Sequence, residues 1–136
     1  MISQIPSENE GVFSGGNADD NRRLIEQKSV KGLILNHSGN RRDSLYERDS
    51  SLNQVLCKLA KNKGVVFFID LGEFLKEDNL KSRAKVLSRF IQNIFLFNKF
   101  GNEVRVVVPK GMSKEDVRAL LTVLGMPTDM IKKALN

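Results

Sequence analysis

The sequence contains almost none of the residues from which disulfide and zinc sites are built. Its 136 residues include one cysteine, Cys57, and one histidine, His37. A single cysteine cannot form a disulfide within the chain, and a zinc site requires several Cys or His ligands. A Ser-His-Asp triad would have to rest on His37 alone. Disulfide scaffolds and zinc-binding modules are therefore excluded as classes for this chain.

Long hydrophobic runs are also absent, so the sequence predicts no helix that crosses a membrane. The first residues have neither the basic start nor the apolar stretch of a secretory signal peptide. A lone cysteine placed within a predicted helix is typical of a reducing compartment. These features together lead us to expect a cytoplasmic protein.

Basic residues are missing from the first twenty positions, and acidic residues are scarce after them. The chain has 22 Lys and Arg against 16 Asp and Glu, which gives a formal net charge of +6. Four of the acidic residues lie in residues 1–20, so the remaining 116 residues carry a surplus of +10. Such a surplus favours a polyanionic partner, and nucleic acid is a better candidate than lipid when no membrane segment is predicted. The alternative is a solvated basic surface without a partner.

Apolar runs alternate with amphipathic segments, which predicts one α/β domain at residues 11–136 behind a flexible N-terminal segment at 1–10. Strands are expected at residues 11–14, 30–36, 65–71 and 103–108. Helices are expected at 19–28, 50–62, 79–100 and 113–124, with a last helix that opens at Pro127. This alternation is typical of a parallel sheet with right-handed crossovers and outer helices.

The segment from Arg48 to Gly64 joins a basic loop to a helix and then to a buried strand. Asp49 or Ser50 is predicted to cap the helix at 50–62, and Gly64 is predicted to end it. Apolar residues recur within this helix at the three- and four-residue spacing of a buried face: Leu52, Val55, Leu56 and Leu59. Continuously apolar residues 65–69 then predict a strand that is covered on both faces.

The helix at 79–100 has apolar residues over about half of its circumference. A helical wheel predicts one core-facing stripe, one apolar flank and one basic arc. The stripe consists of Leu80, Ala84, Leu87, Ile91 and Ile94, the flank of Val86, Phe90 and Phe97, and the basic arc of Lys81, Lys85, Arg89 and Lys99. The flank either packs on a neighbouring helix of the same domain or forms a protein–protein surface.

Polar residues at the expected carboxyl ends of strands are the natural place to look for catalysis in a parallel α/β protein. The sequence offers His37, Asp70, Glu73 and Lys110 there. One histidine and two carboxylates could hold a metal weakly, but residues at strand ends more often bond loop backbone. The spacing after Gly15-Gly16 matches neither the Walker pattern nor the dinucleotide-binding pattern of phosphate loops, so these glycines predict a turn.

Several short elements occur in an order that resembles a known family. They are Gly15-Gly16, Asn21-Arg22 after a four-residue gap, Arg48-Asp49-Ser50, Val55-Leu56, Leu59-Ala60, Arg83-Ala84, Asn93, Lys99-Phe100 and Leu124 to Pro127. Together they resemble protein component 3 of archaeal ribonuclease P, which is related to the thirty-kilodalton subunit of the eukaryotic enzyme. The resemblance covers about residues 11–135. Gln54, Ile91 and Phe95 depart from it, since the family often has histidine at the first position and basic residues at the other two.

The resemblance implies a TIM-like barrel of the polymerase-and-histidinol-phosphatase type, of which this chain would hold only the C-terminal half. It implies a non-catalytic subunit that organises the catalytic RNA for removal of the 5′ leader from precursor tRNA. The Mg²⁺ of that reaction belongs to the RNA, so no cofactor is expected in this chain. The implied partners are the RNA, precursor tRNA and a small RRM-like subunit. The alternatives are a metal-dependent phosphoesterase remnant of the barrel superfamily and a fragment that binds only protein.

The residues expected to contact RNA are five arginines in segments that precede or follow predicted strands, where a guanidinium group matches phosphate oxygens, and three cations within predicted helices. They are Arg22, Arg23, Arg41, Arg42, Arg48, Lys58, Lys61 and Arg83. A half barrel has open sheet edges, so we also expect a second copy or the RRM-like subunit to bind, with Val86, Phe90 and Phe97 as the interface. Alternatively, residues 1–14 fold back and close the sheet within one chain. No catalytic or metal-binding residue is predicted.

Overall fold

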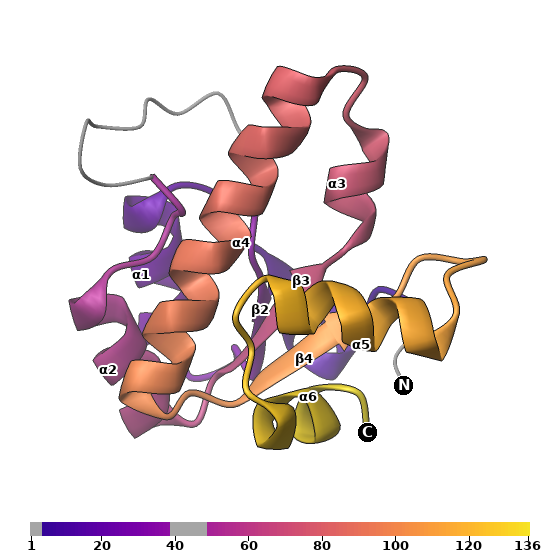
Figure 1. Ribbon diagram of the computed structural model, residues 1–136. Coiled ribbons are helices and arrows are strands. Elements are labelled where there is room, and N and C mark those ends of the chain that lie inside the picture. Colours follow the sequence, from indigo (N-terminus) through magenta and orange to yellow (C-terminus); the bar gives the residue numbers. More distant parts are fainter. Residues whose placement is uncertain (1–3, 39–48) are drawn as a thin grey trace.

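The computed structural model describes residues 4–38 and 49–136 and contains a four-stranded parallel sheet with helices on its outer face (Figure 1). The strands follow one another in the order β1-β2-β3-β4, and every neighbouring pair is parallel. Their bounds are β1 Val12–Ser14, β2 Gly32–Ile34, β3 Val66–Asp70 and β4 Val104–Val107. The parallel α/β class predicted from the alternation of patterns is therefore confirmed.

Helices connect the strands and continue after the last one. Their bounds are α1 Ala18–Glu26, α2 Gln54–Lys63, α3 Gly72–Lys76, α4 Leu80–Phe100, α5 Lys114–Val123 and α6 Thr128–Ala134, and a short 3₁₀ helix, η1, spans Glu8–Glu10. Four of the helices begin at a polar side chain that accepts a backbone N–H of the first turn. These caps are Asn17, Asn53, Asn79 and Ser113, the last of which is the predicted cap of α5.

The main core lies between the sheet and the helices. Alternate strand residues point outward into it, among them Leu33 of β2, Phe67 of β3 and Val106 of β4, which are fully buried. The rings of Phe67 and Phe97 stack with their centroids 5.2 Å apart, which ties α4 to the middle of the sheet. The helices α2 and α4 lie side by side over this core (Figure 1).

The opposite face of the sheet carries a second, smaller apolar cluster. Val12, Phe68 and Val107 form it, with Ile34 and Val66 packed at its edge. In the part of the chain that the structure describes, no helix residue joins this cluster. The sheet therefore has a helical layer on one side only.

The structure corrects the predicted start of the second helix. The helix α2 begins at Gln54 and is capped by Asn53, whose Oδ1 accepts the N–H of Leu56 at 2.9 Å. Ser50 is buried instead of capping, and the Asp49 carboxylate accepts the N–H of Ser51 at 3.3 Å. The local polar turn before the helix thus extends three residues further than the sequence pattern indicates, although Gly64 ends the helix as predicted.

The long helix α4 also faces the core with a different side from the predicted one. Leu80 and Ile91 of the predicted core stripe are 82% and 47% exposed, whereas Arg89 of the predicted basic arc is fully buried. Val86, Phe90 and Phe97 form part of the main core and are at most 2% exposed. The predicted partner interface on these three residues is therefore wrong, because the chain's own sheet already covers them.

Candidate nucleic-acid interface

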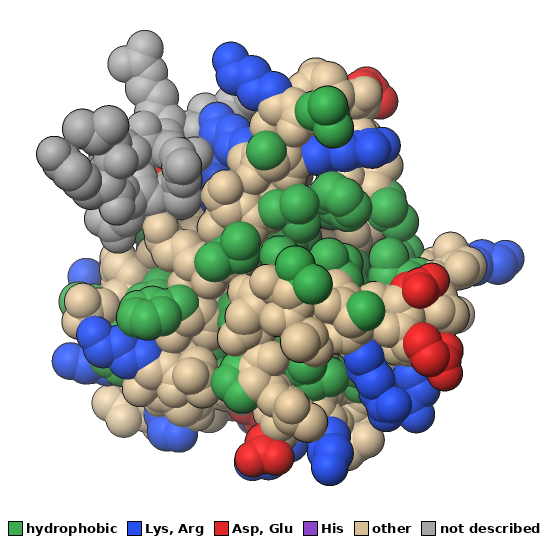
Figure 2. Space-filling model, viewed as in Figure 1, with side chains coloured by type: hydrophobic (Ala, Val, Ile, Leu, Met, Phe, Trp, Pro, Cys, Tyr) green, Lys and Arg blue, Asp and Glu red, His purple; other side chains and the backbone are tan. Residues whose placement is uncertain are grey.

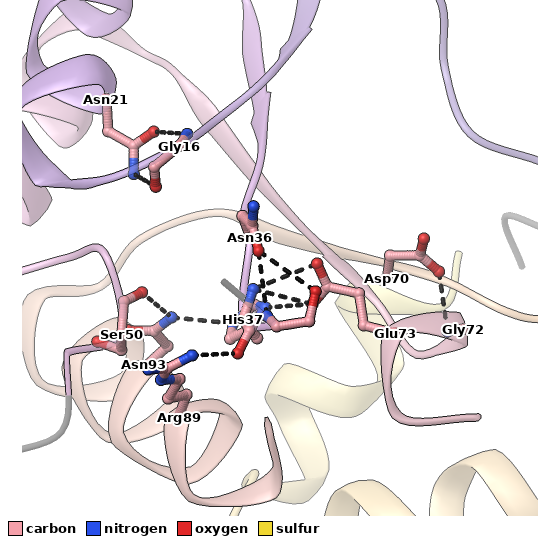
Figure 3. A network of polar contacts seen from close by, with 11 residues as sticks. Gly16, Asn21, Asn36, His37, Ser50, Asp70, Gly72, Glu73, Arg89 and Asn93 are labelled. Carbon is pink, nitrogen blue, oxygen red and sulfur yellow. Dashed lines mark hydrogen bonds and ion pairs between the residues drawn. The ribbon is translucent and has the colours of Figure 1, made fainter. Parts of the chain in front are cut away.

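A network of buried polar side chains lies at the carboxyl edge of the sheet, where β2 and β3 end (Figure 3). His37 is fully buried at its centre. Its Nδ1 lies 2.9 Å from Glu73 Oε2, and its Nε2 lies 2.9 Å from Asn93 Nδ2. The amide nitrogen of Asn93 can only donate, so Nε2 accepts and Nδ1 carries the proton that points to Glu73. One neutral tautomer of His37 thus satisfies both neighbours.

The backbone around His37 is held by the same residues. The N–H of His37 donates to Glu73 Oε2 at 3.0 Å, and Arg89 Nη1 donates to the carbonyl oxygen of His37 at 2.9 Å. The ring of Phe90 meets the imidazole edge-on with a centroid distance of 4.4 Å. Side chains from α3 and α4 therefore fix the position of the chain where it leaves β2.

A second set of hydrogen bonds fixes the chain where it approaches α2. Asn93 Nδ2 donates to the Ser50 carbonyl at 3.1 Å, and Gln92 Nε2 donates to Ser50 Oγ at 2.9 Å. Asn21 Nδ2 donates to the Ser51 carbonyl at 2.9 Å, while its Oδ1 accepts the N–H of Gly16 at 2.9 Å. The amide of Asn93 thus touches both sets, because it bonds both His37 and Ser50.

These two sets of bonds lie on either side of residues 39–48. The predicted RNA-binding residues Arg41, Arg42 and Arg48 belong to that stretch and lie outside the described residues. The structure describes His37 before this stretch and Ser50 after it, and buried side chains hold the backbone of both residues. Buried polar groups of this kind are hydrogen-bonded because leaving them unsatisfied is costly.

The other predicted cations occupy separate places on the described part of the chain. Arg22 forms an ion pair with Glu26 at 2.9 Å and Arg23 one with Asp20 at 3.5 Å, both on the exposed side of α1. Arg83 Nε donates to the Glu77 carbonyl at 2.9 Å in the first turn of α4. These three residues stay predictions as RNA contacts.

Lys58 and Lys61 lie on α2, towards the opposite edge of the sheet. Lys61 Nζ donates to the Gly101 carbonyl at 2.6 Å, and Lys58 Nζ lies 5.6 Å from the centroid of the Phe100 ring. The helix α2 runs into β3, so its last turns are at the amino edge, away from His37. The predicted set therefore does not gather into one cluster.

The helices α2 and α4 present a surface without acidic residues. Their sequences contain Lys58, Lys61 and Lys63 on α2 and five basic residues on α4, and no Asp or Glu in either helix. Figure 2 shows basic and hydrophobic side chains together over α2 and the lower part of α4, at the lower left of the view. Arg89 is buried, but the exposed lysines of these two helices give a positive surface, which attracts phosphates.

Two of the strand-end residues, Asp70 and Glu73, bond neighbouring groups of the chain. Asp70 Oδ1 accepts the N–H of Gly72 at 2.9 Å, and Glu73 is occupied by His37. Within residues 4–38 and 49–136, no group of three or more His, Cys, Asp or Glu side chains could hold a metal ion. None of the helices described is long and apolar enough to cross a membrane.

Sequence reasoning named His37 and Glu73 as strand-end residues but missed their anchoring partners. Asn21, Gln92 and Asn93 were not assigned a role, and Arg89 was placed on the exposed arc of α4. A signal was present, because Asn93 and Arg89 interrupt the side of the helix that carries Val86, Phe90 and Phe97. A polar residue within an apolar arc predicts a buried hydrogen-bond acceptor opposite it.

The fold and the site define a parallel α/β protein with a basic surface and a polar network that holds two irregular segments. No protein-family model matches the chain. It is 31% identical over 131 residues to ribonuclease P protein component 3 of Methanosarcina acetivorans, and 30% identical over 131 residues to the same component of Methanosarcina mazei. Each match covers 92% of this chain and 51% of the relative.

A solved structure leads to the same family. A chain of the cryo-EM structure of archaeal ribonuclease P with mature tRNA is 27% identical to this chain and superimposes with a TM-score of 0.69, over 90% of this chain and 52% of that one. The resemblance to ribonuclease P protein component 3 that the sequence elements indicate is thus confirmed. The chain spans about half the length of the curated relatives that it matches.

Proposed function

We propose that the chain is an RNA-binding protein subunit of ribonuclease P. In this role it binds and organises the catalytic RNA for removal of the 5′ leader from precursor tRNA, and the RNA with its Mg²⁺ carries out the cleavage. The similarity to protein component 3 supports the proposal, as does the acid-free surface of α2 and α4. Cations that neutralise phosphates release counterions and stabilise compact RNA without any protein chemistry.

The observation that carries the proposal is the held backbone at His37 and at Ser50, on either side of residues 39–48. Buried side chains hold His37 before this stretch and Ser50 after it, and the stretch itself contains three arginines. A guanidinium fork matches phosphate oxygens in two places at once, so its affinity depends on how well its backbone is positioned. Fixed ends reduce the conformational freedom that is lost when such a segment binds RNA.

A salt titration of RNA affinity tests this proposal. Binding of ribonuclease P RNA should weaken for Arg48→Ala and Arg22→Ala, and the slope of log K against log salt should become shallower by about 0.7–0.9 per lost phosphate contact. Arg118→Ala is the matched control, since Arg118 is exposed on α5, whose first turn carries Glu115 and Asp116. Unchanged affinity and slope for Arg48→Ala and Arg22→Ala would remove the RNA role from these positions.

We further propose that the sheet is half of a TIM-like barrel. Four parallel strands in sequential order, with helices on one face only, match half of an eight-stranded barrel, and the relatives are about twice as long. Within the described residues β1 and β4 each have one unpaired edge. The second face, with Phe68 and Val107, would then be the inside of the barrel.

An open half barrel calls for a partner, either a second copy of the chain or the small RRM-like subunit. Because Val86, Phe90 and Phe97 are buried, and Val12, Phe68 and Val107 are buried as well, the unpaired edges of β1 and β4 are the surfaces for it. Sedimentation of the purified chain, alone and with the small subunit, should show association. A soluble monomer at micromolar concentration that ignores the small subunit would contradict this proposal.

A further inference from the structure

Two large hydrophobic side chains project from the outer face of α4. Ile91 is 47% exposed and Phe95 is 63% exposed. They are four residues apart, so they lie on the same side of the helix one turn from each other. Neighbouring exposed apolar side chains of this kind are candidates for a binding surface.

One lysine follows this apolar pair along α4, and a second lies on α2 near the ring of Phe100. Lys99 lies one turn beyond Phe95, and its Nζ is 5.5 Å from the centroid of the Phe100 ring. Lys58 of α2 approaches the same ring at 5.6 Å. We call the surface formed by Ile91, Phe95, Lys99, Phe100 and Lys58 the aromatic–lysine face.

The charge of the aromatic–lysine face decides what can cover it. An apolar protein surface placed over it would take Lys58 and Lys99 out of water, and neither helix has an acidic residue to compensate them. Unpaired RNA complements both the aromatic rings and the lysines of this face, because its bases stack on aromatic rings and its phosphates pair with ammonium groups. Stacking needs an exposed ring, and Phe95 is mostly exposed.

We propose that the aromatic–lysine face binds unpaired nucleotides of RNA, with a base stacked on Phe95 and the adjacent phosphates near Lys58 and Lys99. This inference rests on the proposed RNA-binding function and names the class of RNA element that this surface takes.

Tryptophan fluorescence tests the stacking directly, because the sequence contains no tryptophan. Phe95→Trp introduces one reporter into the face, and Val123→Trp introduces one at a position on α5 that is 81% exposed. A short oligouridylate should quench the emission of the Phe95→Trp protein and leave that of the Val123→Trp protein unchanged. A fully paired RNA duplex should quench neither, since its bases are not free to stack.

Affinity measurements separate stacking from a simple apolar contact. Phe95→Ala and Phe95→Leu should both weaken oligouridylate binding by roughly 5- to 150-fold without changing the salt slope, because a base contact is lost and no phosphate contact is. Phe95→Trp should bind at least as well as the wild type.

Three results would decide against the inference. Wild-type affinity for Phe95→Leu would show that the ring is not needed, and would leave an apolar protein contact as the use of the face. Absent quenching in the Phe95→Trp protein while RNA still binds would overturn the inference and leave the proposed function standing. A wild-type chain that binds neither oligouridylate nor ribonuclease P RNA would instead overturn the proposed function itself.

Discussion

The two edges of the parallel sheet are built by different means. At the amino edge α2 and α4 turn directly into β3 and β4 through Gly64 and Gly101, which have φ of 71° and 66°. The backbone N–H groups of these glycines bond carbonyls of the last helical turn, so the turns are closed locally. At the carboxyl edge, by contrast, the side chains of Asn21, Glu73 and Asn93 hold irregular backbone.

The difference between the two edges shows which of them is less favourable for the stability of the fold. A glycine turn constrains a few neighbouring residues, whereas Asn21 and Ser51 are 30 residues apart and Asn93 and His37 are 56 apart. Such long-range buried hydrogen bonds contribute little net stability, and they are expensive when one partner is lost. In parallel α/β proteins the carboxyl edge carries function and the amino edge carries stability. The side-chain network at the carboxyl edge therefore fits a role in function.

The largest expected effect comes from breaking the carboxyl-edge network. Asn93→Leu keeps the branching and the number of side-chain heavy atoms but leaves His37 Nε2 and the Ser50 carbonyl buried without their donor. Two such groups should lower the free energy of unfolding by about 2–6 kcal/mol. Urea denaturation measures the loss, and Asn98→Leu, at an exposed position of the same helix, is the control that should change little. Similar losses of unfolding free energy in Asn93→Leu and Asn98→Leu would show that the hydrogen bonds of Asn93 do not stabilise the carboxyl edge.

The amino edge should set the alkaline limit of stability. The carbonyl oxygen of Cys57 accepts from Asn102 next to the Gly101 turn, and burial raises the pKa of the Cys57 thiol from 9.0 to about 12. Between these values the unfolded chain loses the thiol proton while the folded chain keeps it, so stability is full below pH 9.0 and falls above it. At a pH of about 10.5 the loss should reach roughly 2 kcal/mol.

Comparison with Cys57→Ala isolates this thiol from the lysines and the tyrosine that titrate in the same range. Urea midpoints of both proteins at about pH 8 and about pH 10.5 should show a smaller decline for the variant. Equal declines would mean that the thiol is accessible to solvent. The folded wild type should likewise resist thiol reagents at neutral pH, because Cys57 is fully buried.

The contrast between the edges also explains what could be predicted from the sequence. The order of strands and helices follows from local patterns, and so do the Ser113 cap and the Gly64 stop. The start of α2 does not, because Ser50 satisfies the local rule for a cap but is bound by Gln92 and Asn93, more than forty residues away. Local signals were therefore reliable for the Gly64 stop and the Ser113 cap, and misleading at Ser50, which distant residues bind.

The same reason accounts for the error on α4. Its sequence has more apolar residues than one buried side needs, so a helical wheel alone cannot choose the side that faces the sheet. Arg89 and Asn93 turn inward because buried carbonyls of His37 and Ser50 lie opposite them. Those acceptors exist only once the sheet has formed, and Ile91 and Phe95 are left outside as a consequence.

A smaller effect is expected from the turns of the amino edge. Gly64→Ala should lower the free energy of unfolding by about 1–2 kcal/mol, because an L side chain is strained at a φ of 71°. A Cβ at this position meets no atom within 4 Å, so the loss reports backbone strain alone. Gly64→Asn should lose less, since asparagine tolerates this conformation better. Equal losses for Gly64→Ala and Gly64→Asn would show that strain at the positive φ is not the cause of the loss.

The smallest effect is expected at the one described non-glycine residue with a positive φ, Ser51, at the carboxyl edge. Its φ is 68°, and its buried Oγ has no hydrogen-bond partner within the described part of the chain. Ser51→Gly would relieve the strain and remove the unsatisfied hydroxyl, and the greater freedom of glycine in the unfolded chain offsets part of that gain. We expect the stability to stay the same or rise by up to about 1 kcal/mol, in contrast to the loss at Gly64. Urea denaturation of Ser51→Gly beside Gly64→Ala checks this difference in sign. A loss of more than about 1 kcal/mol in Ser51→Gly would show that the serine hydroxyl supports the hydrogen bond between Asn21 and the Ser51 backbone.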